Sequence, residues 1–335
     1  MLTAVFSLTG ALVFGAADFL GGLAAKRISA LLATAVAALA GVVLLFLALP
    51  LLGGEWSVHD VLWGAISGVV GCIGIALLYA CLAIGPMSIL SPTTAVVSAI
   101  VPVLYGLVFA GERFDPTGYW GLGLALVAVV LVGFVPERGA VRPSLRGIVM
   151  AVGSGAAIGG FYIAIDQTSD ESGIVPLILN RGVNAALMFM AVAVVAILAA
   201  LRARRARDVV GVDAGSVIQS LAANPAGESA DGRSGGGVEA GADGLEGERM
   251  PRADRSATAT GIRLAVACGL VDATANALLL FGIRAGDLSI AAVLGAMYPA
   301  GTILLAALVL RERIAPVQWA GLVLALTAAA MLALA

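Results

Sequence analysis

The stretch Gly-Glu-Arg-Phe-Asp-Pro at residues 111–116 decides the fold, because it returns as Arg-Glu-Arg-Ile-Ala-Pro at residues 311–316. The likeness continues downstream, where Gly-Leu-x-Leu-Ala-Leu stands at 121–126 and again at 321–326. Chance matches of Ala and Leu are common in so apolar a chain, but a Glu-Arg pair followed by Pro at the same spacing is not. The chain therefore contains an internal repeat.

The segments around these motifs are apolar enough to lie in a membrane. Hydrophobic residues make up 61% of the 335 and charged residues only 12%, whereas a soluble domain carries about a quarter charged residues. Spanning a bilayer takes about 20 apolar residues in a helix. Backbone groups in lipid must be hydrogen-bonded internally, and the lack of period-2 alternation excludes a barrel, so helices are predicted. The ten predicted helices cover roughly residues 2–24, 30–51, 60–83, 87–110, 117–135, 146–166, 174–201, 261–283, 287–310 and 316–335.

The repeat divides these helices into two halves of five. With one residue more of offset, residues 68–89 also match residues 269–290. An odd number of helices per half turns the second half upside down, as in the inverted repeats of many secondary transporters. The predicted fold class is thus an all-α polytopic membrane protein with ten transmembrane helices in two inverted five-helix repeats, residues 1–138 and 139–335.

Residues 202–259 differ from the rest of the chain. The segment opens with four arginines within six residues and continues in Gly, Ala, Ser, Asp and Glu. Such a composition cannot bury a core and is typical of a disordered linker. A docking role for a partner is the alternative reading.

The distribution of Lys and Arg predicts the orientation. Most of the 19 Lys and Arg residues follow the first, third, fifth, seventh and ninth segments, whereas the other connections contain only Arg113 and Arg284. The positive-inside rule places the first set of connections, including 202–259, in the cytoplasm. Both termini are then expected outside a plasma (inner) membrane. Residues 1–24 are predicted to be a retained helix, because Lys26 and Arg27 follow the apolar stretch and no positive charge precedes it.

Several classes of function are disfavoured. His59 is the single histidine, and the three cysteines lie within apolar segments without CxxC spacing, so no metal site and no cofactor are predicted. No Ser/His/Asp set and no phosphate-binding loop occurs, so the chain is not expected to be an enzyme. The net charge of −2 gives no reason to expect nucleic acid as a partner.

Three charged residues fall inside the apolar segments: Asp18, Arg181 and Asp272. A charge at the centre of a spanning helix costs about 2.5–3.5 kcal/mol on insertion scales, so each needs a function or a partner. Burial favours the neutral form of a carboxyl, which suits Asp272, and Asp18 as a second candidate, to take up and release protons. The structural alternatives are an ion pair between Arg181 and Asp272 and a capping role for Asp18.

Polar and proline residues complete the predicted site. Asn276 lies one helical turn beyond Asp272, so the two share a face. A proline frees a backbone carbonyl and can kink a spanning helix, so Pro102 and Pro299 are predicted hinges. The residues predicted to contact a solute are Arg181, Asn276, Asn180, Tyr298, Tyr79 and Thr302.

The pattern resembles the EamA-type transporters of the drug/metabolite transporter superfamily. The resemblance rests on ten helices in two halves and on the Glu-Arg-x-x-Pro motif between helices in both, and it covers the chain except 202–259. It implies secondary transport of small metabolites, in many members export driven by proton exchange. In the small four-helix relatives a carboxylate of the first helix exchanges protons for substrate, and Asp18 is the nearest match.

The leading hypothesis is therefore a proton-coupled exporter of small organic solutes that works by alternating access, with solute, protons and the lipid bilayer as its partners. An uncoupled facilitator or importer is the first alternative. A non-transporting scaffold or an accessory to a lipid flippase is the second. The sequence leaves open whether two copies pair as a homodimer.

Overall fold

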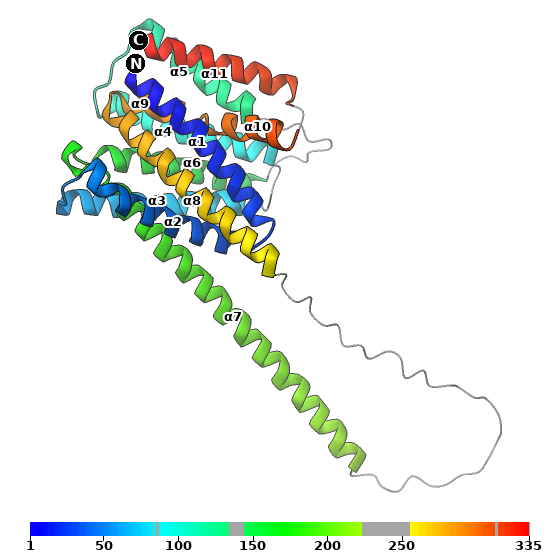
Figure 1. Ribbon diagram of the computed structural model, residues 1–335. Helices are drawn as coiled ribbons and strands as arrows, with labels where there is room; N and C mark the ends of the chain where they lie inside the picture. Colours follow the sequence, from blue (N-terminus) through cyan, green and yellow to red (C-terminus); the bar gives the residue numbers. More distant parts are fainter. Residues whose placement is uncertain (83, 85–86, 134–143, 223–254, 312–313, 335) are drawn as a thin grey trace.

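The computed structural model describes residues 1–82, 84, 87–133, 144–222, 255–311 and 314–334 (Figure 1). Within these residues the chain is helical and has no strand. Ten helical spans are long and apolar enough to cross a membrane, which confirms the predicted all-α fold with ten spanning helices. The elements are α1 (Leu2–Ala25), α2 (Ala30–Leu52), α3 (Val58–Leu82), α4 (Met87–Val108), α5 (Pro116–Gly133), α6 (Leu145–Asp166), the 3-10 turn η1 (Asp170–Ser172), α7 (Val175–Ala222), α8 (Arg255–Arg284), α9 (Leu288–Gly295), α10 (Tyr298–Val309) and α11 (Pro316–Leu334).

Short polar residues start several of these helices. The Ser29 side chain accepts a hydrogen bond from the backbone N–H of Leu32 at the start of α2, and Ser144 caps α6 in the same way. Asp115 accepts a hydrogen bond of 2.8 Å from the backbone N–H of Gly118 in the first turn of α5. Each cap satisfies one of the backbone donors that a helix start leaves free.

The helices pack in pairs that cross between the two predicted halves. The most extensive contact joins α1 to α8, and α3 packs against α6 and α7. α1 also contacts α9 and α10, and α4 contacts α6 and α9. Figure 1 shows α5 and α11 side by side at one edge of the bundle, and both chain termini at the same end of it.

Small residues allow the closest of these crossings. At the crossing of α1 and α10, a Cβ added at Gly301 would lie 2.5 Å from the carbonyl oxygen of Leu12 and 3.1 Å from the Cα of Gly15. The two backbones therefore touch directly, as small-residue contacts allow in membranes.

The ninth span is broken near its middle. α9 ends at Gly295 and α10 begins at Tyr298, with Ala296 and Met297 in a turn between them. Pro299 has no N–H to donate to the carbonyl of Gly295, four residues earlier, which explains why the helix is interrupted here. The fourth span carries Pro92 and Pro102 but stays one continuous helix, α4.

The seventh helix is much longer than the sequence predicted. α7 runs for 48 residues and, in Figure 1, its C-terminal part extends well beyond the bundle. The prediction of a linker from residue 202 is therefore wrong for 202–222, which are helical, and for 255–259, which belong to α8. The arginines that open this segment are good helix formers, and that propensity outweighed the composition argument. The rest of the predicted linker lies outside the described residues, as do Glu312 and Arg313 of the repeated motif.

Candidate functional site

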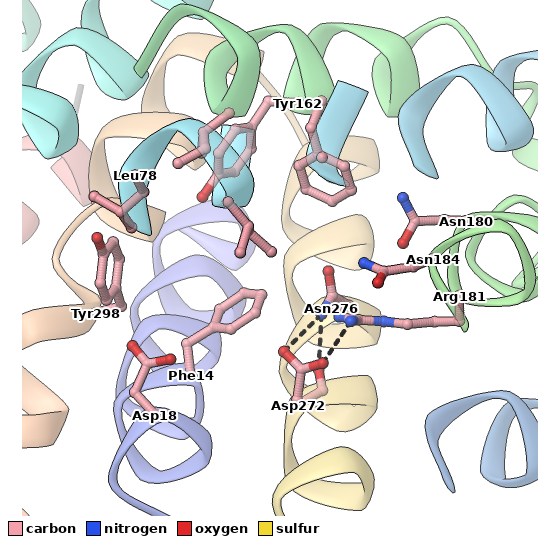
Figure 2. Close-up of a pocket in the computed structure, with 14 residues that line it drawn as sticks. Phe14, Asp18, Leu78, Tyr162, Asn180, Arg181, Asn184, Asp272, Asn276 and Tyr298 are labelled. Atoms are coloured by element: carbon pink, nitrogen blue, oxygen red, sulfur yellow. Dashed lines mark hydrogen bonds and ion pairs between the residues drawn. The ribbon is translucent and has the colours of Figure 1, made fainter. Parts of the chain in front are cut away.

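A cavity of about 240 Å³ lies inside the bundle, and Figure 2 shows the side chains around it. Six helices contribute to its wall: α1, α3, α6, α7, α8 and α10. Helices of both predicted halves therefore form it. The lining residues are Phe14, Asp18, Gly71, Ile75, Leu78, Ile158, Phe161, Tyr162, Asn180, Arg181, Asn184, Asp272, Asn276 and Tyr298.

An ion pair stands on one side of the cavity. Nη1 of Arg181 on α7 lies 2.6 Å from Oδ2 of Asp272 on α8 (Figure 2). The Arg181 side chain is 12% exposed and that of Asp272 is 22% exposed, so the pair is largely shielded but open to the cavity. The alternative that the sequence left open, an ion pair joining these two helices, is present in the structure.

Three asparagines surround this pair. Asn276 donates hydrogen bonds from Nδ2 to the backbone oxygen of Asp272, at 2.8 Å, and to its Oδ1, at 3.3 Å. Asn180 donates to the hydroxyl of Ser67 on α3 at 2.9 Å, which fixes the amide against the neighbouring helix. Asn184 is buried, and its Oδ1 has no hydrogen-bond partner among the described residues. A buried acceptor without a donor is costly, so this oxygen is suited to receive one from a ligand.

Asp18 on α1 is the second acid in the cavity. Its side chain is exposed even though it belongs to a spanning helix, because it faces the cavity. No described residue hydrogen-bonds to it or forms an ion pair with it, and the charged side chain that acts on it is the like-charged Asp272. In Figure 2 Phe14, one helical turn earlier on α1, is drawn between Asp18 and the Arg181–Asp272 pair.

The structure brings six of the predicted site residues together: Asp18, Asn180, Arg181, Asp272, Asn276 and Tyr298. Of the others, Thr302, Pro102 and Pro299 do not line the cavity. Thr302 donates a hydrogen bond of 3.2 Å to the backbone oxygen of Gly15 and so joins α10 to α1. Pro102 packs on α6, where its Cδ would lie 3.0 Å from a Cβ added at Gly159. Pro299 stands at the start of α10. The side chain of Tyr79 lies outside the described residues.

The sequence prediction omitted several lining residues, and helical spacing would have found two of them. Asn184 follows Asn180 by four residues, and Phe14 precedes Asp18 by four, so each shares a helix face with a predicted site residue. Phe161 and Tyr162 on α6 carry no such signal, because none of the predicted site residues lies on that helix. Among the described residues no group of His, Cys, Asp and Glu is arranged to hold a metal ion.

A second set of polar contacts ties the helix ends on the side of the two termini. Arg284, at the end of α8, donates to the backbone oxygens of Gly173, at 2.6 Å, and Ser169, at 2.9 Å, in the connection before α7. Asp60 on α3 accepts from the backbone N–H of Ser169 at 2.7 Å and from its hydroxyl at 2.9 Å. These bonds link α3, α8 and the α6–α7 connection.

Glu112, from the repeated motif, caps a helix of the other half. Its carboxylate accepts from the hydroxyl of Ser289 and, at 3.4 Å, from the backbone N–H of Ser289 in the first turn of α9. Burial raises the pKa of Glu112 above its ordinary value, and nearby Asp287 adds to the rise, while the bonds from Ser289 and Leu288 oppose it. The contact fastens the α4–α5 connection onto α9.

Comparison with known proteins identifies the C-terminal part of the chain. Residues 249–334 match the EamA-like transporter family, of the drug/metabolite transporter superfamily. The resemblance expected from the Glu-Arg motif is confirmed over this segment, which contains α8 to α11. The family match and the polytopic helical fold point to a transporter rather than an enzyme. No curated protein matches the chain significantly.

A solved structure shares the overall fold. The structure, described as "Crystal structure of protein", aligns with a TM-score of 0.64 at 15% sequence identity and covers 99% of this chain and 98% of that chain. At this identity the likeness concerns the fold alone. It extends over all ten spans, beyond the segment that the family match covers.

Proposed function

We propose that the protein is a secondary active transporter that exports small organic solutes across the plasma (inner) membrane in exchange for protons, by alternating access. The observation that carries this proposal is the cavity in which α1 and α3 of the first half meet α6, α7, α8 and α10 of the second. Charged side chains within spanning helices are expensive, and they commonly mark solute and proton pathways. The match of residues 249–334 to the EamA-like transporter family supports transport as the function.

The pattern of helix contacts supports an inverted repeat. If the halves correspond, α1 matches α6, α2 matches α7, α3 matches α8, α4 matches α9 with α10, and α5 matches α11. When each helix is replaced by its counterpart in the other half, the contact α1–α8 corresponds to α6–α3. In the same way α2–α8 corresponds to α7–α3, and α1–α10 corresponds to α6–α4. All six of these contacts occur. Such an arrangement can adopt two mirrored states, each open to one side of the membrane.

The contacts between helix ends on the side of the termini favour a state that is closed on that side. Glu112 with Ser289, and Arg284 with Ser169 and Gly173, join helix ends on that side. All eight residues of α9, the half of the ninth span on that side, are buried, whereas in α10 only Ala300 and Gly301 are. Access to the cavity is therefore expected from the side of α10. The break before Pro299 offers α10 a place to move, and Pro102 offers α4 a corresponding bend.

Asp18 and Asp272 are the proposed proton sites. A proton on Asp272 would neutralise the partner of Arg181 and free the guanidinium to hydrogen-bond a solute. Asn276 and Asn180 hold their positions by hydrogen bonds beside that pair. Asp18, which has no counter-charge among the described residues, would be stable in lipid only with a proton or a cation beside it.

Reconstituted protein tests this function. Proteoliposomes containing a pH-sensitive dye would be exposed to amines, amino acids, sugars and nucleosides, and solute-driven proton movement would be recorded. The wild type should move protons with at least one solute class, and Asp18→Asn should abolish that coupling. Asp115→Asn is the matched control, because Asp115 caps α5 away from the cavity and asparagine caps equally well.

The same experiment separates the rival functions. Solute flux that is equal with and without a proton gradient would identify an uncoupled facilitator and refute the exchange mechanism. No solute flux from any class would refute transport and favour a scaffold. The direction of transport follows from the side of the vesicle membrane on which the solute must be present for protons to move.

A further inference from the structure

We propose that Arg284 is the lock of the transport cycle: it closes the cavity on the side of the termini by fastening the end of α8 to the connection between α6 and α7. This lock also makes the empty protein rest in the state that is open on the side of α10. The proposal rests on the transport function proposed above. It assigns a positioning role to a residue that does not line the cavity.

The guanidinium of Arg284 binds the α6–α7 connection at several points. Nη1 donates to the backbone oxygen of Gly173 at 2.6 Å, and Nη2 donates to the backbone oxygen of Ser169 and to the hydroxyl oxygen of Ser172, both at 2.9 Å. The side chain is 14% exposed, so water competes little for these bonds. Hydrogen bonds from a charged donor are stronger than neutral ones, and the planar guanidinium holds several acceptors in a fixed geometry.

The α6–α7 connection is itself held by the connection between α2 and α3. The backbone N–H of Glu55 donates to the backbone oxygen of Glu171 at 2.8 Å. Gly173 has a φ of 51°, and a Cβ added there would lie 2.7 Å from the Cα of Gly54, so the two connections touch. In the part of the chain that the structure describes, the hydrogen bonds between the α6–α7 connection and α8 all come from Arg284. The contact with α8 is therefore the place where this end of the bundle can part.

The contact is built so that it can open again. Ile174 and Ile283 belong to one buried apolar cluster, but apolar contacts are non-directional and do not fix one arrangement. Nε of Arg284 is buried without a hydrogen-bond partner among the described residues, and Oδ1 of the exposed Asp170 lies 3.7 Å from it. A shielded donor without an acceptor costs free energy. Water would satisfy this donor once α8 moved away, which lowers the cost of breaking the other bonds.

One helix connects the lock with the cavity. Asp272 and Asn276 line the cavity from α8, and Arg284 ends the same helix (Figure 2). A rigid helix transmits a displacement from one of its ends to the other. A solute that binds Asp272 or Asn276 therefore acts on the element that carries the lock.

Only the second half of the repeat contains this arginine. At the offset at which residues 68–89 match residues 269–290, Ala83 corresponds to Arg284. If the halves correspond, the end of α3 would close the opposite side by meeting the connection between α1 and α2, and an alanine side chain has no donor for it. The state closed at the termini therefore has a charged lock that the mirrored state lacks. With the termini outside, as the positive-inside rule predicts, the resting cavity opens to the cytoplasm, from which an exporter takes its solute.

Thiol labelling from each side of the membrane tests the lock. The native cysteines Cys72, Cys81 and Cys268 are replaced by alanine, and Ile75 in the cavity wall is changed to cysteine in every protein compared. Vesicles are treated with a membrane-impermeant maleimide in solute-free buffer. Protease access to a C-terminal tag then separates the molecules labelled from the side of the termini from those labelled from the side of α10. The parent protein with Arg284 should react slowly from the side of the termini and fast from the side of α10.

Variants of Arg284 should change the labelling from one side only. Arg284→Gln should raise the rate from the side of the termini roughly tenfold or more, because it removes the charged hydrogen bonds. It should not raise the rate from the side of α10, because a shift between two states opens one side at the expense of the other. Arg284→Lys keeps the charge but not the planar fork, so its increase should be smaller. Arg263→Gln is the matched control, since Arg263 is exposed near the other end of α8, and it should react like the parent protein.

The outcomes separate the lock from a merely structural role and from the transport function. Faster labelling of Arg284→Gln from both sides would mean that Arg284 only stabilises the fold, and it would overturn the proposal. Unchanged labelling from the side of the termini would overturn it as well, in Arg284→Gln where thermal unfolding shows that variant to be folded, and otherwise in Arg284→Lys. Labelling needs no solute flux. A lock that behaves as proposed in a protein that moves no solute would refute only the transport function, whereas transport with labelling independent of Arg284 would refute only the lock.

Discussion

Arg181 and Asp272 form an ion pair that joins α7 to α8, with Nη1 of the arginine 2.6 Å from Oδ2 of the aspartate. Asp272 also accepts from Asn276, so its carboxylate has two donors, whereas the second cavity acid, Asp18, has none among the described residues. The two acids of one cavity are therefore in opposite situations. Substitution of each should have opposite consequences for stability.

Asp272→Asn should destabilise the fold strongly. The substitution leaves the Arg181 guanidinium shielded from water without a counter-charge, and removal of one partner of a buried ion pair costs about 3–5 kcal/mol. The midpoint of thermal unfolding in detergent should fall accordingly. The double variant Arg181→Gln/Asp272→Asn should recover part of this loss, because it leaves no unpaired charge. A double variant less stable than Asp272→Asn would contradict this account.

Asp18→Asn should leave the unfolding midpoint unchanged or raise it. The wild-type carboxylate is opposed by Asp272 and has no counter-charge, so a neutral amide of the same shape removes a repulsion and breaks no described bond. The comparison needs neutral pH and solute-free buffer, since a bound cation would stabilise the wild type alone. A fall as large as that of Asp272→Asn would mean that Asp18 has a structural partner.

The stability of the Glu112–Ser289 contact should depend on pH. The pKa of Glu112 is raised in the folded protein, chiefly by burial, so the folded state holds this proton more tightly than the unfolded chain does. Its contribution to stability is complete below the ordinary carboxyl pKa and is lost as the pH rises through the raised value. Glu112→Gln keeps an acceptor for Ser289 but cannot ionise, so it should flatten this part of the profile and exceed the wild type at neutral pH. Thermal unfolding across the mildly acidic range gives the dependence of stability on pH for the wild type and for Glu112→Gln. If the wild type gained stability relative to Glu112→Gln as the pH rises, the prediction would be contradicted.

The spanning helices and the central charges could be predicted from the sequence for one reason. In lipid, both the length of an apolar segment and the presence of a charge within it have large energetic consequences. Asp18, Arg181 and Asp272 were found in this way, and the structure places all three around one cavity. Helical spacing then added Asn276, which lines the same cavity.

The remaining features depend on packing between distant segments. Thr302 has a hydroxyl that could bind a solute, but this hydroxyl donates a hydrogen bond to the backbone oxygen of Gly15. This bond depends on the crossing of α1 and α10, which the sequence does not indicate. Pro102 and Pro299 are chemically alike, yet only the span of Pro299 is interrupted. Composition also misplaced the end of α7, because Arg and Ala are compatible with both a linker and an exposed helix.

The crossing of α1 and α10 gives a last prediction, which concerns movement. Gly301→Ala should destabilise the protein by about 1–3 kcal/mol, the usual cost of overpacking, because the new methyl group would meet the backbone of Leu12 at 2.5 Å. Gly22→Ala is the matched control, since it is also a helical glycine but a Cβ there meets no heavy atom within 4 Å. If α10 moves against α1 during transport, Gly301→Ala should also slow solute exchange in proteoliposomes more than it weakens binding of the transported solute. Equal losses of binding and exchange would indicate that the crossing only supports the cavity, and a variant as stable as the Gly22→Ala control would show that the two backbones do not touch in the membrane.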